Sequence, residues 1–378
     1  MPQKQAKSET NNANALKHMF GAEHLQRIAT AIHLAYPQFN KSKITQIYQK
    51  LSALEMKPRV HLIRDTLRSE LPEKFPHALK ILLLSVEKGS LKGFDLWPYT
   101  EFIQTYGIEH AKLSLDALKK LTKLFTSEWA VRPFLTRNAT TTLTYLLKCS
   151  RDKNVHVRRW ASEGSRPRLP WGERLSEFIV NPHLTLNILE TLKYDSELYV
   201  RKSVANHLND ISKDHPELVT KLLSGWKRSA PTVQRAKIDW ITSHALRTLI
   251  KQGDRRALKL IGVATKTEVR LKQFTINKKI CRLGDKLVFS CLLESSSKSL
   301  QKLVVDYVIH YMRANQKLTP KVFKLKNVQL AANKSISITK SHHFKKVSTR
   351  THYSGVHVLE IQVNGLILKS YQLNLISN

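Results

Sequence analysis

A pattern that occurs twice in the middle of the chain constrains the fold more than any other feature. Asp152 and Asp195 are each followed by four residues and then by a Val-Arg pair, which begins at Val157 or Val200. A small or apolar residue stands four positions after each valine, so the two side chains share one face of a helix. Because the copies are 43 residues apart, the spacing predicts HEAT-like repeats of two helices, stacked into a solenoid.

The two copies also predict how each repeat is built. We expect the aspartate to cap the second helix, the valine to face the stack, and the arginine to lie beside this apolar stripe. Equivalent arginines of stacked repeats line up along one concave edge, where a duplex can lie. Residues 231–235 are similar to a degenerate third copy and are followed by Trp240, His244 and Arg247 at helical spacing. The alternative is that the Val-Arg pairs only mark the starts of helices.

From residue 264 onward, helical spacing gives way to alternation of apolar and polar residues. Strands are predicted at residues 286–293, 302–312, 335–339, 360–363 and 366–371. Asn364-Gly365, between the last two, suits the type I′ turn of a hairpin. Short strands separated by turns are typical of an immunoglobulin-like sandwich.

The predicted organisation is therefore an α + β multidomain chain. An all-α HEAT-like solenoid is expected at residues 15–263 and an all-β immunoglobulin-like sandwich at residues 264–378. The boundary is predicted near residues 262–267. Residues 1–14 are expected to be disordered.

The net charge narrows the range of partners. The 378 residues contain 63 Lys and Arg against 29 Asp and Glu, a formal net charge of +34, and residues 264–378 alone carry +15. Such a surplus is tolerable where the partner is a polyanion, and nucleic acid is a better candidate than an anionic membrane. No apolar run approaches the roughly 20 residues of a membrane span, and the first residues lack the apolar core of a signal peptide.

The cysteines are compatible with a reducing compartment. Cys149, Cys281 and Cys291 are widely spaced, form no CxxC pair and match no zinc-site spacing. Reduced, buried thiols are the simplest interpretation, so we expect a cytoplasmic protein.

Three segments do not fit a plain solenoid, because each places an acid beside aromatic or basic residues. They are residues 127–134 with Glu128, residues 163–172 with Glu163 and Trp171, and residues 200–210 with Asp210. The prolines and glycines of the second segment break a helix soon after it starts. The alternative interpretations are a rigid kink with a packed tryptophan for the second segment and a solvated aspartate at a helix end for the third.

Together these segments resemble a known family. Ser-Glu-Trp-Ala-Val-Arg-Pro-Phe at 127–134, the run from Val-Arg-Arg-Trp to Leu-Pro-Trp-Gly at 157–172, and Tyr-Val-Arg-Lys-Ser-Val-Ala-Asn-His-Leu-Asn-Asp-Ile at 199–211 are similar to the AlkC branch of the HEAT-like DNA glycosylases, relatives of AlkD. The similarity covers residues 15–263. The sandwich resembles the immunoglobulin-like extension of one AlkC subgroup. The resemblance implies a bacterial base-excision enzyme that removes N3-methylated bases, above all 3-methyladenine, without flipping the lesion into a pocket; 3-methylcytosine stays open.

The chemistry of that reaction accounts for acids on a basic surface. An N3-alkylated purine is cationic and leaves as a neutral base, so it needs no general acid. The positive sugar and the attacking water remain to be stabilised and placed, and carboxylates suit both tasks. Aromatic rings beside the lesion attract its positive charge.

The resemblance and this chemistry together give the candidate site residues. We expect catalytic roles for Glu128, Glu163 and Asp210, lesion contacts from Trp171, Trp129 and Trp160, and DNA contacts from Arg158, Arg159, Arg166, Arg168, Arg201, Lys202 and Arg247. For Glu163 the alternative is to orient the nearby arginines, and Trp129 and Trp160 are alternatively core residues.

The expected partner is double-stranded DNA with alkylated bases, bound by a monomer without metal or other cofactor. Three alternatives remain: a non-catalytic DNA-binding HEAT module, an RNA-binding or protein-scaffold solenoid, and a metal enzyme. The metal enzyme would be built on His342, His343, His352 and His357. It is disfavoured because these histidines lack acid partners at ligand spacing.

The sandwich is expected to provide a second DNA contact that closes the groove into a clamp. The residues that suggest it are Lys278, Lys279, Lys324, Lys326, Lys345 and Lys346. The alternative is a solvated basic surface without a partner.

Overall fold

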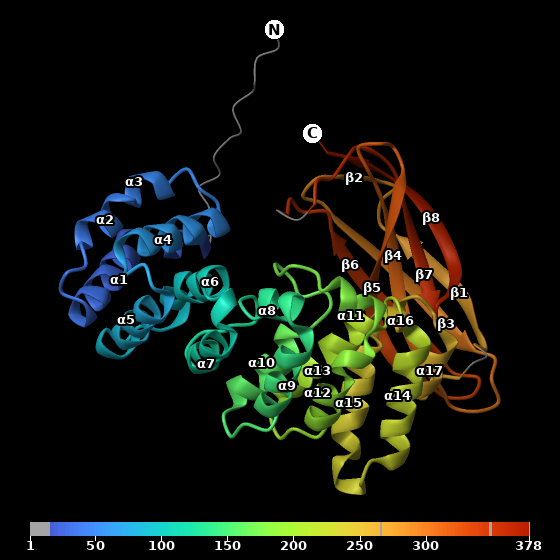
Figure 1. The fold of residues 1–378 in the computed structure, drawn as a ribbon. Helices are drawn as coiled ribbons and strands as arrows, with labels where there is room; N and C mark the ends of the chain where they lie inside the picture. Colours follow the sequence, from blue (N-terminus) through green and yellow to red (C-terminus); the bar gives the residue numbers. More distant parts are fainter. Residues whose placement is uncertain (1–15, 265–266, 348–349, 378) are drawn as a thin grey trace. The chain divides into compact units, whose positions relative to one another are not determined.

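The computed structural model describes residues 16–264, 267–347 and 350–377, so the predicted disordered segment 1–14 lies outside the described residues. The chain divides into two compact units between His207 and Leu208. The first unit is helical, and the second combines helices with β-strands (Figure 1). The predicted class, helices first and then a β-sandwich, is confirmed.

The first unit consists of short helices joined by turns. They are α1 (Ala22–Ala35), α2 (Lys41–Gln46), α3 (Tyr48–Leu51), α4 (Met56–Glu70), α5 (Phe75–Lys88), α6 (Trp97–Tyr106), α7 (Ala111–Leu121), α8 (Arg132–Arg137), α9 (Ala139–Cys149), α10 (Val155–Gly164), α11 (Ser176–Val180), α12 (His183–Leu192) and most of α13 (Leu198–Ile211), with 3-10 turns at Leu16–Met19, Gly93–Leu96 and Ile108–His110. Among the described helices, none combines the length and apolar character needed to cross a membrane.

The predicted apolar stripes form the core of the repeats. α10 packs on α9 and α12, and its Val157 and Ala161 are completely buried. On α13, Val200 and Val204 are completely buried as well. The i, i+4 spacing therefore places each pair on the face that meets the neighbouring helices, as predicted.

The predicted helix cap is wrong by two residues. The N-cap of α10 is Asn154, whose side chain accepts hydrogen bonds from the backbone N–H groups of His156 and Val157 at 2.9 and 3.3 Å. Asp152 instead accepts from the N–H of Asn154 at 2.8 Å and pairs with Lys119 at 2.7 Å. The aspartate thus shapes the turn before the cap rather than the cap itself.

The arginine of each Val-Arg pair holds the turn that precedes its own helix. Nη1 of Arg158 donates to the carbonyls of Asp152 and Lys153 at 3.1 and 2.9 Å. Nη1 of Arg201 donates to the carbonyls of Asp195 and Ser196 at 2.7 and 2.8 Å, which are the equivalent positions of the next copy. The repeated pattern is therefore explained by a repeated structural contact.

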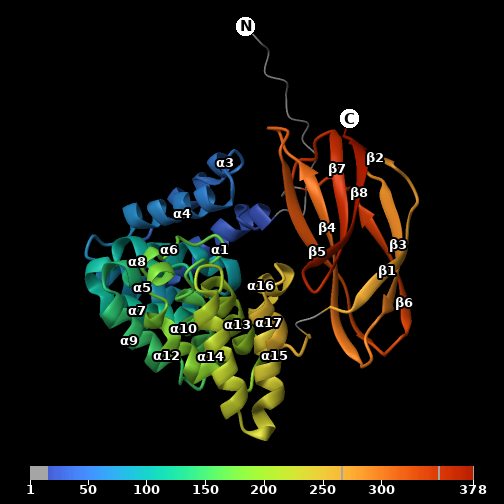
Figure 2. The same ribbon diagram turned by 90° about the vertical axis from the view of Figure 1, so that its right-hand side faces the viewer.

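The helices of the second unit pack beside one another (Figure 2). They are α14 (Pro216–Ser229), α15 (Arg235–Ala245), α16 (Arg247–Lys251) and α17 (Arg255–Leu260), with a 3-10 turn at Thr232–Gln234. The predicted third copy thus corresponds to the 3-10 turn and the start of α15.

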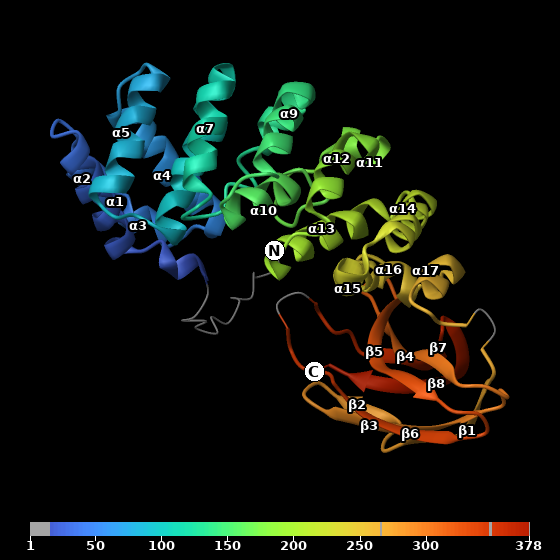
Figure 3. The same cartoon turned by 90° about the horizontal axis from the view of Figure 1, so that it is seen from below.

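Two sheets face each other in the sandwich (Figure 3). The first has the order β1-β3-β6 and the second β2-β8-β7-β4-β5. The strands are β1 (Val269–Ile276), β2 (Ile280–Arg282), β3 (Lys286–Ser295), β4 (Gln301–Met312), β5 (Leu318–Leu330), β6 (Ser335–His343), β7 (Gly355–Val363) and β8 (Leu366–Ile376). The predicted strands correspond to β3, β4, β6, β7 and β8, and alternate residues of β3 are buried in the core.

β5 was not predicted, although it is the longest of the described strands. Lys324 and Lys326 are exposed on it, and β5 forms one edge of the five-stranded sheet. Edge strands often carry lysine and proline, which discourage pairing with other chains, and these residues hide the alternation that identifies a strand.

The β7–β8 turn packs against the helices of its own unit. Asn364 and Gly365 have φ values of 49° and 84°, as the predicted type I′ turn requires. A Cβ atom on Gly253, between α16 and α17, would lie 2.7 Å from Cα of Gly365, so only glycine allows this approach. Gln362 also donates to the carbonyl of Lys251 at 2.9 Å. The sandwich is therefore held directly by α16 and α17.

Candidate active site

Glu128 lies in the turn between α7 and α8 and is almost completely buried, with 7% of its surface exposed. Its Oε2 accepts a hydrogen bond from Thr126 at 2.7 Å and forms an ion pair with Nη1 of Arg159 on α10. Trp160 fixes this turn, because its indole N–H donates to the carbonyl of Ser127 at 3.0 Å. The carboxylate is thus held in one position.

Glu163 lies on the last turn of α10 and is also buried. Its Oε1 pairs with Nη1 of Arg166 at 2.7 Å and lies 3.5 Å from Nη2 of Arg159. Its Oε2 accepts a hydrogen bond from Ser203 on α13 at 2.6 Å. Both oxygens of Glu163 therefore have partners.

Arg159 joins the two carboxylates. Burial alone would lower the pKa of Arg159, but Glu128 and Glu163 outweigh it and hold this pKa above its ordinary value. The guanidinium also lies over the ring of Tyr199, 5.0 Å from its centroid. A cation that is shielded from water is stable only beside negative partners, so Arg159 stays between the two carboxylates. It thereby fixes their distance from each other.

A cavity of ≈ 180 Å³ opens beside this network, lined among others by Lys123, His156, Arg159 and Tyr199. Three cationic or ionisable groups and a phenol surround it. The cavity can therefore accept a small anionic group next to the Glu128–Arg159 pair. Tyr199 and His156 were not among the predicted site residues, although Tyr199 belongs to the segment that carries the family resemblance.

His207 supports the network from α13. Its Nδ1 lies 3.0 Å from the carbonyl of Ser162, and because a carbonyl only accepts, Nδ1 carries the proton. Burial lowers the pKa of His207 to about 3, with the positive charge of Arg166 acting in the same direction. The imidazole is thus a neutral part of the scaffold.

Asp210 lies on the last turn of α13, and only 2% of its surface is exposed. Its Oδ1 pairs with Lys213 at 3.1 Å. Ser203, His207 and Asp210 follow one another at i, i+4 and i+7, so they share one face of this helix. The burial of Asp210 contradicts the alternative of a solvated aspartate.

The segment between Glu163 and Trp171 is clamped by Arg132, a residue that the sequence analysis did not propose for the site. Arg132 is 1% exposed, and its Nη1 donates to the carbonyls of Gly164 and Arg166 at 2.9 and 2.8 Å. Its Nε donates to the carbonyl of Glu173 at 2.7 Å. One guanidinium therefore binds both ends of the segment. The only available signal was an Arg-Pro pair at a helix start, which does not distinguish a buried arginine from an exposed one.

Trp171 projects from this segment, with 57% of its surface exposed. Its indole stacks on Trp129 with a centroid distance of 6.3 Å, and Trp129 stacks on the buried Trp97 at 4.9 Å. Trp171 has a φ of 63°, which L-residues rarely adopt, and its carbonyl accepts a hydrogen bond from Lys57. The exposed ring of Trp171 is thus held in place by the stacked rings of Trp129 and Trp97.

Trp160 does not fit its predicted role as a lesion contact. It is completely buried and binds the carbonyl of Ser127, so the expectation is corrected to a core residue that supports Glu128. Trp129 is partly buried and lies beneath Trp171, and its indole N–H donates to the carbonyl of Pro170 at 3.1 Å.

The predicted DNA-binding residues fall into two groups. Arg158 forms a two-point ion pair with Asp195, at 2.6 and 3.1 Å, in addition to its contacts with backbone carbonyls. Arg166 is 6% exposed and holds Glu163, and Arg201 holds its own turn. For Arg158 and Arg166 the expected phosphate contact is corrected to a structural one, because Arg158 binds protein atoms through all three of its nitrogens and Arg166 is buried. For Arg201, of which Nη1 binds its own turn, the phosphate contact stays a prediction.

The other predicted DNA contacts stay predictions. Arg159 belongs to the acidic network and also lines the cavity. Lys202 is exposed on α13, and Arg168 is partly exposed in the clamped segment. Arg247 begins α16 and donates to the carbonyl of His244 at 2.7 Å.

His342 and His357 are buried in the sandwich, whereas His343 is exposed. Nδ1 of His342 lies 3.0 Å from the hydroxyl of Tyr307, and Nε2 lies 3.0 Å from that of Tyr311. Burial lowers the pKa of His342 to about 4. In the part of the chain that the structure describes, no group of three His, Cys, Asp or Glu side chains is arranged to hold a metal ion. The three cysteines are buried and unpaired, as predicted.

Comparisons with known proteins agree with this architecture. Residues 270–377 match the family model described as "Uncharacterised protein YhaZ, C-terminal Ig-like domain". The protein YhaZ of Bacillus subtilis is 37% identical over 357 residues, which cover 94% of this chain and 98% of that protein. The alkylpurine DNA glycosylase AlkC of Pseudomonas fluorescens, solved bound to DNA containing an abasic site analog, is 40% identical, covers 96% of this chain and 99% of its own, and superimposes with a TM-score of 0.89.

Proposed function

Because this chain belongs to the AlkC family of alkylpurine DNA glycosylases, we propose that it is a monofunctional DNA repair glycosylase. It hydrolyses the N-glycosidic bond of cationic N3-alkylated bases in duplex DNA, with 3-methyladenine as the principal substrate, and leaves an abasic site. It acts as a monomer in the bacterial cytoplasm, where the DNA is. The base stays in the duplex stack during the reaction.

The observation that supports this proposal best is the pair of buried carboxylates joined by Arg159. Two acids beside a basic surface do not help a protein that only binds phosphates, because their negative charge opposes binding. Hydrolysis of a cationic nucleotide needs such acids, since positive charge develops on the sugar as the neutral base leaves. The geometry therefore favours the glycosylase over the non-catalytic DNA-binding module.

The two carboxylates have different hydrogen-bond partners, and we assign them different roles in the reaction. Both oxygens of Glu163 are hydrogen-bonded, by Arg166 and by Ser203, so this carboxylate stabilises positive charge without accepting a further proton. Thr126 and Arg159 both bind Oε2 of Glu128, which leaves Oε1 to orient the attacking water. Asp210, on the last turn of α13, contributes to stabilisation of the positive sugar in this proposal.

Trp171 contributes to recognition of the lesion. Its exposed ring offers a π face to the cationic base, an attraction of about 0.5–2 kcal/mol. The stack on Trp129 and Trp97 limits the motion of the ring and so reduces the entropy lost on binding.

Release of free base from methylated duplex DNA, measured in single turnover, tests the proposal. The wild-type protein should release 3-methyladenine well above the rate of the DNA in buffer, and Glu128→Gln, Glu163→Gln and Asp210→Asn should each slow release. Absence of release by the wild-type protein, with DNA binding intact, would establish the non-catalytic module. Full activity in all three variants would reject the site.

The sandwich contributes a second DNA contact in this proposal. Lys324 and Lys326 are exposed on the edge strand β5 and form no ion pair among the described residues, although the charge of Lys324 acts on the buried Asp306. Deletion of the sandwich is a poor test, because it would also expose α16 and α17. The double variant Lys324→Gln/Lys326→Gln should instead weaken duplex binding and reduce the slope of log affinity against log salt by about 1–2. An unchanged slope would remove these lysines from the interface.

A further inference from the structure

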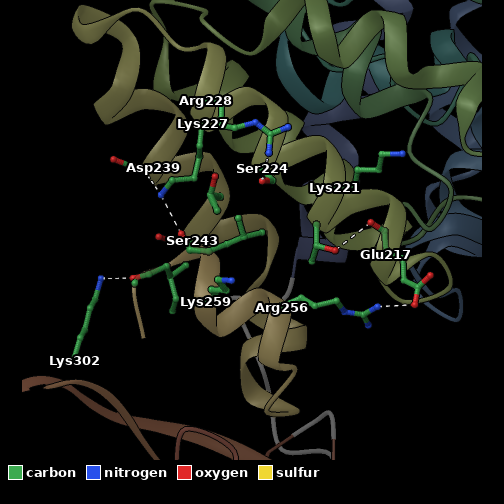
Figure 4. Close-up of a pocket in the computed structure, with 15 residues that line it drawn as sticks. Glu217, Lys221, Ser224, Lys227, Arg228, Asp239, Ser243, Arg256, Lys259 and Lys302 are labelled. Atoms are coloured by element: carbon green, nitrogen blue, oxygen red, sulfur yellow. Dashed lines mark hydrogen bonds and ion pairs between the residues drawn. The ribbon is translucent and has the colours of Figure 1, made fainter. Parts of the chain in front are cut away.

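A large cleft in the second unit lies between α14, α15 and α17 (Figure 4). Its volume is ≈ 1070 Å³, and it is open to solvent. Lys302, at the start of β4, completes its wall. The cleft is therefore large enough for a ligand of several charged groups and contains no residue of the proposed catalytic site.

The lining of this cleft is strongly basic. Its cations are Lys221, Lys227, Arg228, Arg256, Lys259 and Lys302, and its acids are Glu217 and Asp239. The excess of four positive charges in one concave surface concentrates a positive potential there. Such a surface selects anions.

The two acids of the cleft are already paired. Glu217 binds Arg256 at 2.7 Å, and Asp239 binds Lys227 at 2.7 Å. Lys227 is held further by the carbonyl of Leu260 at 3.0 Å. These pairs fix the walls and leave other cations without a carboxylate.

The cations without a carboxylate partner, in the part of the chain that is described, are Lys221, Arg228, Lys259 and Lys302, of which Lys302 donates to the carbonyl of Ile261 at 2.6 Å. Lys221, Ser224 and Arg228 follow each other along α14 at i, i+3 and i+7, so they form one stripe that faces the cleft. Nη1 of Arg228 is bound by Ser224 at 3.2 Å. Lys259 projects from α17 on another side of the same space. Positive groups thus approach one volume from two helices.

A buried hydroxyl in the same wall provides an independent observation. Thr242 on α15 lines the cleft and is 0% exposed, and its Oγ1 has no hydrogen-bond partner among the described residues. A threonine inside a helix ordinarily donates to the carbonyl four residues earlier. A buried hydroxyl without a partner is unfavourable, and a ligand oxygen in the cleft would satisfy it.

We propose that this cleft binds a phosphate-rich anion, either a free polyphosphate or the phosphodiester backbone of DNA. Lys221, Arg228 and Lys259 neutralise the phosphates, and the Thr242 hydroxyl donates to one of their oxygens. Phosphate oxygens accept several hydrogen bonds each, which suits cations and a hydroxyl converging from three helices. The site does not depend on the glycosylase proposal, since none of its residues takes part in base release.

Titration calorimetry with inorganic triphosphate and the full chain tests the site. Wild-type protein should bind triphosphate at one site, and Lys221→Gln/Lys259→Gln should weaken this binding by about tenfold or more. The matched control is Arg235→Gln/Arg255→Gln, which removes two exposed charges from α15 and α17 outside the cleft. Equal weakening in both double variants, or no binding by the wild type, would overturn the proposal.

Thr242→Val tests triphosphate binding with no expected loss of stability. Because the hydroxyl has no protein partner, its removal should leave the unfolding midpoint unchanged or raise it, while triphosphate affinity falls by about fivefold. Unchanged affinity would remove the hydroxyl from the site and contradict the proposal as stated.

The same variants distinguish the two possible sources of phosphate, the DNA backbone and a free polyphosphate. If Lys221→Gln/Lys259→Gln also weakens binding of undamaged duplex DNA relative to the control pair, the natural ligand is a DNA backbone. If only triphosphate binding falls, it is a free polyphosphate. Base release from methylated DNA should persist in this variant at saturating enzyme, so failure of the glycosylase proposal and failure of this one remain distinguishable.

Discussion

Two regions of this chain use positive charge in opposite ways. Around Glu128 and Glu163, arginines are paired with acids: Arg166 is buried, and the largely buried Arg159 is held between two carboxylates. In the cleft of the second unit, Lys221 and Lys259 face solvent without a carboxylate partner among the described residues. A buried cation is retained only with an acid beside it, whereas an exposed one is stabilised by water. The first arrangement therefore positions acids for chemistry, and the second is available to bind an anion.

The largest expected effect is a slower base release after substitution of a buried acid. Glu128→Gln keeps the size of the side chain and its hydrogen-bonding oxygen but removes the negative charge, so base release should slow by about 100-fold or more. Single-turnover release from methylated duplex measures it. Duplex affinity should stay the same or rise, because a negative charge is lost. A rate within about threefold of wild type would show that the buried acids are structural.

The next effect concerns the clamp that holds the acidic region in shape. Arg132→Met leaves the carbonyls of Gly164, Arg166 and Glu173 without their donor and should lower the free energy of unfolding by about 3 kcal/mol. Urea denaturation measures this loss. Base release by the folded fraction should also fall, because Trp171 is no longer fixed.

Arg132→Lys provides the matched control for the clamp. It keeps the charge but not the planar fork, so it should restore part of the stability and little of the base release. Complete restoration of both would mean that charge alone, and not the geometry of the guanidinium, holds the segment.

A third prediction tests how firmly the sandwich is joined to the helices that form the cleft. Gly365→Ala adds a Cβ at a φ of 84° against Gly253, which should lower the free energy of unfolding by about 2 kcal/mol or more. Gly284→Ala is the control, since its φ is 98° but an added Cβ meets nothing within 4 Å. Thermal unfolding of both variants separates contact from backbone strain; equal losses would argue against close packing at the turn.

Substitution of Trp171 should have a smaller effect, and it should change activity but not stability. Trp171→Ala should slow release of a cationic base by about tenfold and leave stability nearly unchanged, because the ring is 57% exposed. Trp171→Gly should be at least as stable as Trp171→Ala, since glycine adopts a φ of 63° without strain. Competition with neutral and cationic base analogues checks whether the ring recognises charge; equal loss for both would indicate simple stacking.

The smallest effect is a pH dependence in the second unit. Burial raises the pKa of Asp306 to about 6, although Lys251 and Lys324 oppose the shift. Because the folded state holds this proton more tightly than the unfolded chain, with its ordinary value of 3.8, stability is highest below that value and falls as the pH rises through about 6. Asp306→Asn should raise the free energy of unfolding at neutral pH by about 1 kcal/mol and flatten the profile between the two values. A profile identical to wild type would exclude Asp306 as the titrating group.

Local patterns carried much of the fold prediction. The i, i+4 apolar pairs placed Val157 and Val200 in the core, and Asn364-Gly365 predicted the hairpin turn, because helical spacing and turn geometry are properties of neighbouring residues. The edge strand β5 was missed because its lysines hide the alternation. The predicted domain boundary near 262–267 stays a prediction, since α14–α17 and the sandwich belong to one compact unit.

The candidate site was predicted less completely than the fold. The acids stood out because they are the minority charge on a basic chain, and Glu128 and Glu163 do share one arginine. The roles of the arginines were not predictable, because an arginine that binds carbonyls and one that binds phosphate have the same local sequence. Arg132 was not identified as a clamp, since its partners lie more than 30 residues away along the chain.

The sequence by itself determined the helical repeats, the β-sandwich and its hairpin, and the segments that hold the acids, since each follows from spacing between near neighbours. Only the tertiary structure decided which charges are buried. It paired Arg158 with Asp195, Arg166 with Glu163 and Arg132 with backbone carbonyls, and it left Lys221, Arg228 and Lys259 of the α14–α17 cleft exposed to solvent. The reason is physical: the energy of a charge depends on its distance from partners and from water, and both distances are set by residues far apart in the chain.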